Sequence, residues 1–394
     1  MEIEGELAIY LYTAGGVVNK VDIQSSRPLN AARIFHGKPV TDVLQTLPLL
    51  YHVCGTAQAH AAVMACEDAM KFQVSASVSA AREMLVWMET AREHCWRILL
   101  DWAVFLDEQG DRVAIATIQQ AMTELQQALF VDGKGFRLEA RLDLQLSRVE
   151  SILQKLEDLL STTIFAMPIA QWLAIESETE LKVWLQKHDT IASRLLNQLI
   201  NTRSRQQAVP GVSFLPEMDI EQLNARLTSD TAVHFIRQPD WQGMPCETGP
   251  LARQLAQPLM ASLLMQYGHG VIPHMVARLL ELANIPGILQ QCLERVRSGQ
   301  FSQGEQSDLN YSAGVGFGQV EAARGRLVHR VELEQEVIQR YQILAPTEWN
   351  FHPSGLAASL LKQLPAQDKL ALKQQADIVI NSIDPCVRYN LVTH

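Results

Sequence analysis

The spacing of apolar and polar positions predicts a chain that is mostly helical. Apolar side chains recur about every third or fourth position from residue 77 to residue 107, which is the pattern of one long amphipathic helix. An alanine-rich stretch from Gly55 to Met70 predicts a tightly packed helix. The same periodicity predicts further helices at 112–129, 137–160, 178–186, 189–206, 219–228, from about 254 to 265, at 274–297 and at 365–380.

Two stretches have the alternation that is typical of β-strands. Residues 3–24 place β-branched and aromatic side chains on both sides of Gly15 and Gly16, which predicts an N-terminal hairpin. Residues 311–344 contain three more strand-like runs. We therefore expect a mainly α (α+β) fold: a long-helix bundle with a small N-terminal β-sheet and a further β segment near 311–344.

Composition and charge narrow the class of protein. Of the 394 residues, 47% are hydrophobic and 19% are charged, so the chain can bury a large core. Its formal net charge of −10 argues against a nucleic-acid-binding surface, which needs clustered Lys and Arg. Neither a basic, apolar leader nor an apolar run of about 20 residues is visible. We expect a cytoplasmic protein without a membrane span.

The cysteines are the first candidates for chemistry. None is paired at Cys-x-x-Cys spacing, so the sequence predicts neither a disulfide framework nor a closed four-cysteine metal site. Cys54 precedes Gly55 at a helix start, and Cys386 follows Asp384-Pro385, so we expect accessible sulfurs of lowered pKa. Taken alone, either cysteine is more often a small buried hydrophobic residue, which is how we interpret Cys66, Cys95 and Cys292.

Our hypothesis is that Cys54 and Cys386 meet, with Cα atoms within about 7 Å. Two thiolates would favour a soft transition metal but leave its coordination incomplete. The residues that could complete a ligand pocket are Arg324 as an anion-binding group, Glu4 as a proton-handling carboxylate, and the histidines His60 and His329. Each has an ordinary alternative: a surface salt bridge, a solvated strand-start carboxylate, or a histidine bonded to the backbone.

Six short blocks occur in a characteristic order from one end of the chain to the other. They are Glu4-Gly5, Cys54-Gly55, residues 247–253 (ETGPLAR), residues 321–325 (EAARG), residues 346–350 (PTEWN) and residues 384–386 (DPC). In this order they resemble the large subunit of nickel–iron hydrogenases. The resemblance implies that family's fold and a single large-subunit-like domain over 1–394, comprising an N-terminal β/helical segment (1–50), a helical bundle (51–237) and a C-terminal part (238–394) that returns to the N-terminal cysteine.

The resemblance also implies where a metal would bind. In the family, two Cys-x-x-Cys motifs hold nickel and an iron that carries cyanide and carbon monoxide. The first cysteine of each motif corresponds to Cys54 and Cys386, whereas the second positions are Ala57 and Tyr389, which cannot bridge two metals. Three further positions depart from the family pattern: a histidine is displaced to His60, another is replaced by Val392, and a distal-site glutamate is replaced by Ala32.

These losses resemble the large-subunit-like accessory proteins of hydrogenase formation (HupK/HoxV type). That resemblance implies a non-catalytic maturation scaffold that transiently carries iron with its cyanide and carbon monoxide ligands and holds no stable nickel. The implied partners are hydrogenase maturation chaperones, an iron-loading complex, and the hydrogenase large subunit as recipient. Two alternatives remain open: a metal-free interaction protein that mimics the large subunit, and a divergent hydrogenase.

Overall fold

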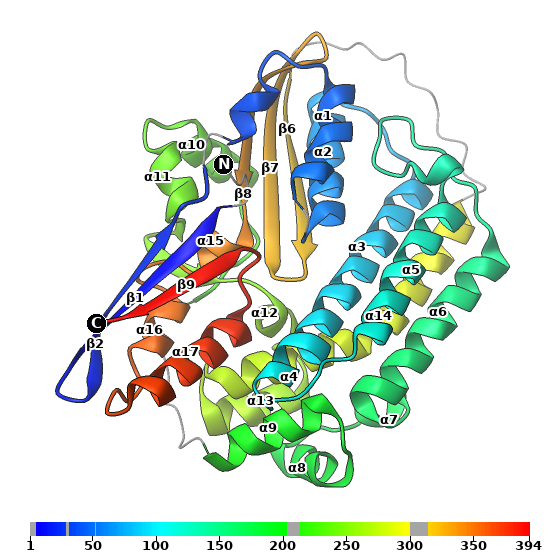
Figure 1. The fold of residues 1–394 in the computed structure, drawn as a ribbon. Coiled ribbons are helices and arrows are strands. Elements are labelled where there is room, and N and C mark those ends of the chain that lie inside the picture. Colours follow the sequence, from blue (N-terminus) through cyan, green and yellow to red (C-terminus); the bar gives the residue numbers. More distant parts are fainter. Residues whose placement is uncertain (1–4, 29–30, 52, 203–212, 300–313) are drawn as a thin grey trace.

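Long helices gathered on one side of the molecule form the bundle that the apolar periodicity predicts. The computed structural model describes residues 5–28, 31–51, 53–202, 213–299 and 314–394. In it, α3 (Ala76–Trp96), α5 (Arg112–Leu129), α6 (Leu146–Leu160) and α14 (Val271–Gly299) lie side by side (Figure 1). Side-chain caps begin two of these helices: Ser75 accepts from the backbone N–H of Val78 at 3.3 Å, and Asp111 accepts from that of Ala114 at 2.9 Å.

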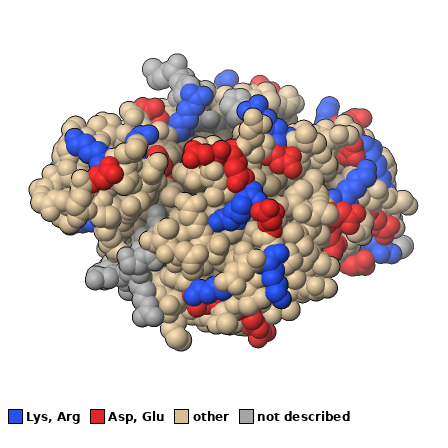
Figure 2. Space-filling view, turned by 60° about the horizontal axis from the view of Figure 1, so that its bottom comes forward, with Lys and Arg blue, Asp and Glu red and all other residues tan. Residues whose placement is uncertain are grey.

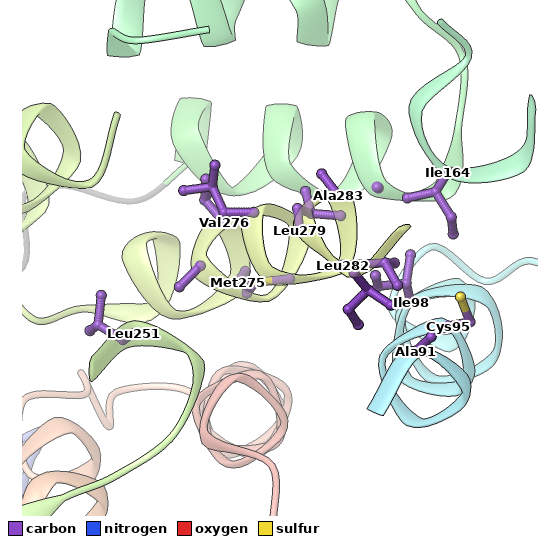
Figure 3. Close-up of a cluster of buried hydrophobic side chains, with 14 of the residues drawn as sticks. Ala91, Cys95, Ile98, Ile164, Leu251, Met275, Val276, Leu279, Leu282 and Ala283 are labelled. Carbon is purple, nitrogen blue, oxygen red and sulfur yellow. The ribbon is translucent and has the colours of Figure 1, made fainter. Parts of the chain in front are cut away.

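Helix α14 is the centre of the bundle. Its residues 271–286 are buried on nearly all sides, whereas its residues 287–299 are buried along one stripe. Figure 3 shows Leu282 of α14 beside Ile98, which follows α3, and places Ile164 on the opposite flank. Helix α14 therefore fixes the relative positions of the helices that carry the buried arginines described below.

The largest differences from the predicted helix boundaries are in two places. The expected helix at 77–107 is interrupted after Trp96 by a π-helical turn, η3 (Arg97–Asp101), before the short α4 (Trp102–Val104). The expected helix at 137–160 begins only at Leu146. The residues before Leu146 lie along the end of α5 and hydrogen-bond to it. For example, the backbone N–H of Asp143 donates to the carbonyl of Leu129 at 2.9 Å. Tertiary pairing thus replaces the first helical turns.

The two ends of the chain share one sheet. Strands β1 (Glu6–Ala14) and β2 (Val17–Ser25) form the predicted hairpin, and Gly15 and Gly16 both have positive φ (61° and 79°), as its tight turn requires. A strand that the sequence did not predict, β9 (Arg388–Thr393), pairs with β1 in parallel, so the order is β2-β1-β9. This pairing fixes the C-terminal tail at the edge of the sheet, where its residues are exposed or half-buried.

The strand-like runs near 311–344 form a second sheet of order β6-β7-β8, and only residues 311–313 lie outside the described part. Its strands are β6 (Gly314–Ala322), β7 (Gly325–Glu334) and β8 (Val337–Leu344). Helix α2 (Gly55–Ala69) lies against β6, where Gly316 and Gly318 face Ala65 and Ala61 (Figure 1). A Cβ at Gly318 would lie 2.0 Å from the carbonyl oxygen of Ala61. Only glycine permits this contact, which sets the position of α2 and of Cys54 at its N-terminus.

The remaining elements connect and cover these parts. The short sheet β3 (Ser213–Phe214), β5 (Met244–Glu247) and β4 (Asp240–Trp241) has the order β3-β5-β4. The shorter helices are α1 (Val40–Thr46), α7 (Ile169–Trp172), α8 (Glu178–Lys187), α9 (Ile191–Thr202), α10 (Ile220–Thr228), α11 (Ala232–Arg237), α12 (Pro250–Gln254), α13 (Pro258–Tyr267), α15 (Pro346–Asn350), α16 (Leu356–Leu361) and α17 (Lys369–Ile383), with short 3₁₀ or π turns at η1 (Ala31–Phe35), η2 (Leu47–Leu50), η4 (Val131–Gly133) and η5 (Ser161–Phe165).

The surface carries charges of both signs. On the face shown in Figure 2, Lys and Arg side chains alternate with Asp and Glu between wide uncharged areas, as on an ordinary solvent-facing surface. Within the described ranges, no helix combines the length and the apolar character that a membrane crossing would need.

The contact between β6 and α2 predicts that an added methyl group destabilises the protein at Gly318 but not at Gly287. Gly318→Ala should lower the free energy of unfolding by about 3 kcal/mol or more, because the new Cβ overlaps helix backbone. Gly287→Ala in α14 is the matched control: its Cβ meets nothing within 4 Å, and alanine favours a helix by up to about 1 kcal/mol. Equal denaturant midpoints for the two variants would contradict this account of the packing.

Candidate metal centre

Cys54 is the N-cap residue of α2 and is half-buried. The N-terminus of α2 binds the Glu89 carboxylate and not the Cys54 sulfur: the N–H groups of Thr56 and Ala57 donate to this carboxylate at 2.7 and 2.9 Å. Burial, followed by the negative charges of Cys386 and Glu89, raises the pKa of the Cys54 thiol. The expectation of a lowered pKa is therefore wrong for Cys54, because desolvation outweighs the helix dipole.

Cys386 lies in the turn between α17 and β9, and only 8% of its surface is exposed, so the expectation of an accessible sulfur is also wrong. Its sulfur has two hydrogen-bond partners, Nη2 of Arg27 at 3.1 Å and the hydroxyl of Thr347 at 2.9 Å. The backbone N–H of Cys386 donates to the same hydroxyl oxygen at 3.3 Å, so Thr347 contacts both the sulfur and the backbone of Cys386. Arg27 thus places a permanent positive charge against the Cys386 sulfur.

The structure brings the two cysteines into one electrostatic neighbourhood. The charge of Cys386 acts on Cys54, and Arg27 interacts electrostatically with both sulfurs. This supports the hypothesis that they meet, while the expected Cα separation stays a prediction. Within the described part of the chain, no group of three or more His, Cys, Asp or Glu side chains has the geometry of a metal site. The protein would thus supply two sulfurs, and other ligands would have to come with the cargo.

Arg324 belongs to a buried ion cluster beside Cys386. Its Nη1 donates to Glu93 at 2.7 Å, and its Nη2 lies 3.2 Å from Asp384. Asp384 also pairs with Arg97 and, at 3.7 Å, with Arg278. Burial alone would raise the pKa of Asp384, but these three arginines hold it well below its usual range. Asp384 is consequently ionised, and the turn before Cys386 is anchored to three separate elements.

Three of the blocks noted in the sequence meet around this cluster. Asn350 accepts from the backbone N–H of Thr248 at 2.9 Å and donates to the carbonyl of Arg324 at 3.0 Å. Gly325 has φ 127°, and a Cβ there would lie 2.4 Å from the Thr248 methyl group. These three blocks therefore contact one another, and Arg324 connects them to Asp384.

Cys54 is linked to His329 through Gln58. The Gln58 amide donates to the Cys54 sulfur over 3.6 Å, and its oxygen accepts from His329 Nε2 at 2.8 Å. This leaves His329 Nδ1 to accept from the Tyr341 hydroxyl at 2.7 Å. Burial lowers the pKa of His329 to about 3, so the ring is neutral near pH 7. His329 thus orients Gln58 and does not contact the sulfur itself.

The other expected pocket residues are placed differently. His60 is buried on α2 and packs against Phe136, with ring centroids 5.9 Å apart; burial and the nearby Arg82 lower its pKa to about 3. Within the described residues, it forms no hydrogen bond to either cysteine. Glu4 lies outside the described residues, so its place is not assigned.

Sequence reasoning missed Arg27, Thr347 and Gln58, which touch the sulfurs, and Arg97 and Arg278, which hold Asp384. Two features of the sequence could have indicated three of these residues. Thr347 lies inside a block that carried the resemblance, and Arg97 and Arg278 interrupt apolar stretches of helix, where an unpaired arginine would be costly. Arg27 and Gln58 had no local signal, because distant pairing places them.

The neutral state of His329 predicts an acid-sensitive step in stability. An unfolded histidine binds a proton below about pH 6.5, whereas the folded ring resists it down to about pH 3, so stability falls as pH falls between these values. From pH 7 to 5, wild type should lose about 2 kcal/mol more than His329→Gln in denaturant unfolding. The same pH dependence in wild type and His329→Gln would contradict the assignment.

Comparisons with known proteins agree with this architecture. Residues 201–388 match the family model for nickel-dependent hydrogenase. The hydrogenase expression/formation protein HupV of Azotobacter chroococcum mcd 1 is 26% identical over 395 residues, covering 98% of both chains. The hydrogenase expression/formation protein HoxV of Cupriavidus necator is 28% identical, covering 94% of this chain and 92% of HoxV.

Solved structures bear on the fold. The reduced, active nickel–iron–selenium hydrogenase of Desulfomicrobium baculatum superposes with a TM-score of 0.66 over 98% of this chain and 97% of that chain, at 16% identity. At that identity the likeness establishes the fold and nothing more. The chain is therefore similar over nearly its whole length to hydrogenase expression/formation proteins, and it has the fold of the nickel–iron hydrogenase large subunit.

Proposed function

We propose that this protein is a non-catalytic accessory scaffold in the formation of a nickel–iron hydrogenase. In this proposal, Cys54 and Cys386 transiently carry an iron fragment with two cyanides and one carbon monoxide before its transfer to the large subunit. The observation that carries it is the pair of sulfurs, from opposite ends of the chain, that share the neighbourhood of Arg27. HupV and HoxV, which this chain matches over nearly its full length, are hydrogenase expression/formation proteins, and this supports the role in hydrogenase formation.

The charges around the sulfurs suit such a cargo. Iron(II) with two cyanides is neutral, so binding to two thiolates makes a doubly negative complex. Arg27 donates to the Cys386 sulfur, and Arg324 interacts electrostatically with Cys386. The Nε atom of Arg324 is buried and has no hydrogen-bond partner among the described residues. We propose that Arg324 donates to an iron-bound cyanide through charge-assisted hydrogen bonds.

The positions that would carry bridging cysteines are occupied by residues with other contacts. The Ala57 side chain is fully buried, and its N–H is bound to Glu89. Tyr389 donates its hydroxyl to Asp377 at 3.0 Å. Neither side chain offers a thiolate that could bridge two metals, which favours a carrier of one iron over a divergent hydrogenase. The proposed partners are the maturation chaperones and iron-loading complex that deliver the fragment, and the large subunit that receives it.

Infrared spectroscopy tests the carrier directly. Protein purified anaerobically from a host with its maturation system should show cyanide and carbon monoxide stretches, and metal analysis should find iron without nickel. The bands should vanish in the Cys54→Ala/Cys386→Ala double variant. Cys246→Ala, which removes a buried thiol in β5, should retain them.

Other outcomes would select the alternatives. Full hydrogenase formation in cells that contain only the double cysteine variant would refute the carrier and favour a metal-free docking protein. Hydrogen uptake with a dye acceptor would show catalysis and contradict the scaffold. Infrared bands unchanged by the double substitution would place the fragment elsewhere and overturn the assignment of the two cysteines.

A further inference from the structure

Arg27 occupies an unusual position for an arginine. It follows β2, and only 13% of its side chain is exposed. One end of its guanidinium contacts Glu348 through Nη1 at 3.2 Å, and the other contacts the Cys386 sulfur through Nη2 at 3.1 Å. The charge of Cys54 also acts on it. A permanent cation is therefore held beside both candidate metal ligands.

The surroundings fix this orientation. Gly5, with φ 68°, lies against the Arg27 backbone so closely that a Cβ would be 2.5 Å from the Arg27 Cα. Glu348 is buried and holds one nitrogen, which leaves the other directed at sulfur. The planar guanidinium can make both contacts at once, whereas a lysine ammonium would be a single charged point. Arg27 is thus anchored at its backbone and at its tip.

The net charge of the occupied centre decides which cargo this cation favours. Two thiolates with a bare divalent ion, such as nickel(II), form a neutral unit, which offers a buried guanidinium little compensation for its lost hydration. Two thiolates with the neutral iron–dicyanide–carbonyl fragment form a dianion, which Arg27 stabilises. In a weakly screened interior, this difference of two charges between the nickel and iron complexes outweighs a modest difference in the affinity of the two metals for thiolate.

We propose that Arg27 determines the specificity of the two-cysteine centre: it favours an anionic iron assembly and opposes a bare divalent cation. Arg27 would take over part of the charge compensation that a second metal supplies in a binuclear centre. The identity of the anionic cargo rests on the proposed function. The rejection of bare nickel does not, because it concerns only the two sulfurs and Arg27.

A nickel(II) titration of the cargo-free protein tests this rejection. Full-length protein, expressed without maturation genes and kept reduced under anaerobic conditions, is titrated while thiolate-to-nickel charge-transfer absorption and bound metal are measured. Arg27→Gln, which removes the charge, should bind nickel at least about tenfold more tightly than wild type. Arg27→Lys should stay near wild type because the charge remains.

Three further variants complete the experiment. Arg226→Gln removes an arginine that pairs with Asp240 away from the cysteines, and it should not change nickel affinity. Adding Cys54→Ala and Cys386→Ala to Arg27→Gln should abolish the gain. Arg27→Met serves as a second neutral variant if Arg27→Gln fails to fold, as judged by its circular dichroism spectrum.

Two results would overturn the proposal: nickel affinity unchanged in both neutral variants, or the same gain in Arg27→Lys as in Arg27→Gln. Failure of the carrier is recognised separately, because it would appear as absent infrared bands in wild-type protein and would leave the nickel titration interpretable. If the carrier holds, Arg27→Gln protein from the native host should contain less iron fragment and more nickel than wild type.

Discussion

A single buried carboxylate, Asp384, connects the parts of this fold that make the candidate centre. Arg97 comes from the end of the α3 segment, Arg278 from α14 and Arg324 from the turn between β6 and β7, and all three converge on it. Because loss of one partner leaves buried charge uncompensated, such a cluster strongly penalises rearrangement. Cys386 lies two residues after Asp384, so the same ion pairs restrict its position. The parallel pairing of β9 with β1 then carries the chain end away beside the N-terminal hairpin.

Cys54 is positioned by a different physical principle. The glycines of β6 allow α2 to approach at backbone contact, and Gln58 on α2 is oriented by His329 and Tyr341. One thiol is therefore placed by steric fit and a neutral hydrogen-bond chain, and the other by paired charges. Arg27 interacts electrostatically with both sulfurs and so connects their surroundings. This division is consistent with a centre that keeps its sulfurs in place before any cargo arrives.

Local pattern was sufficient for most elements but not for the contacts between them. The period of apolar residues predicted α5 and α14 closely, and Gly15-Gly16 predicted the hairpin, because these depend on near neighbours in sequence. Strand β9 and the true start of α6 were missed, since distant segments satisfy their backbone groups. In the candidate site, the sequence indicated Cys54, Cys386 and Arg324, which lie in motifs. It could not indicate Arg27, whose contact with Cys386 exists only after the two ends of the chain have folded together.

X-ray absorption at the iron edge would test most directly whether one metal is shared by the two cysteines. The account predicts two sulfur neighbours per iron in anaerobically loaded wild-type protein, in addition to the diatomic ligands. Cys54→Ala and Cys386→Ala, measured separately on whatever iron remains bound, should each show one. A wild-type spectrum without sulfur neighbours, or sulfur counts that neither substitution changes, would contradict a centre built from both ends of the chain.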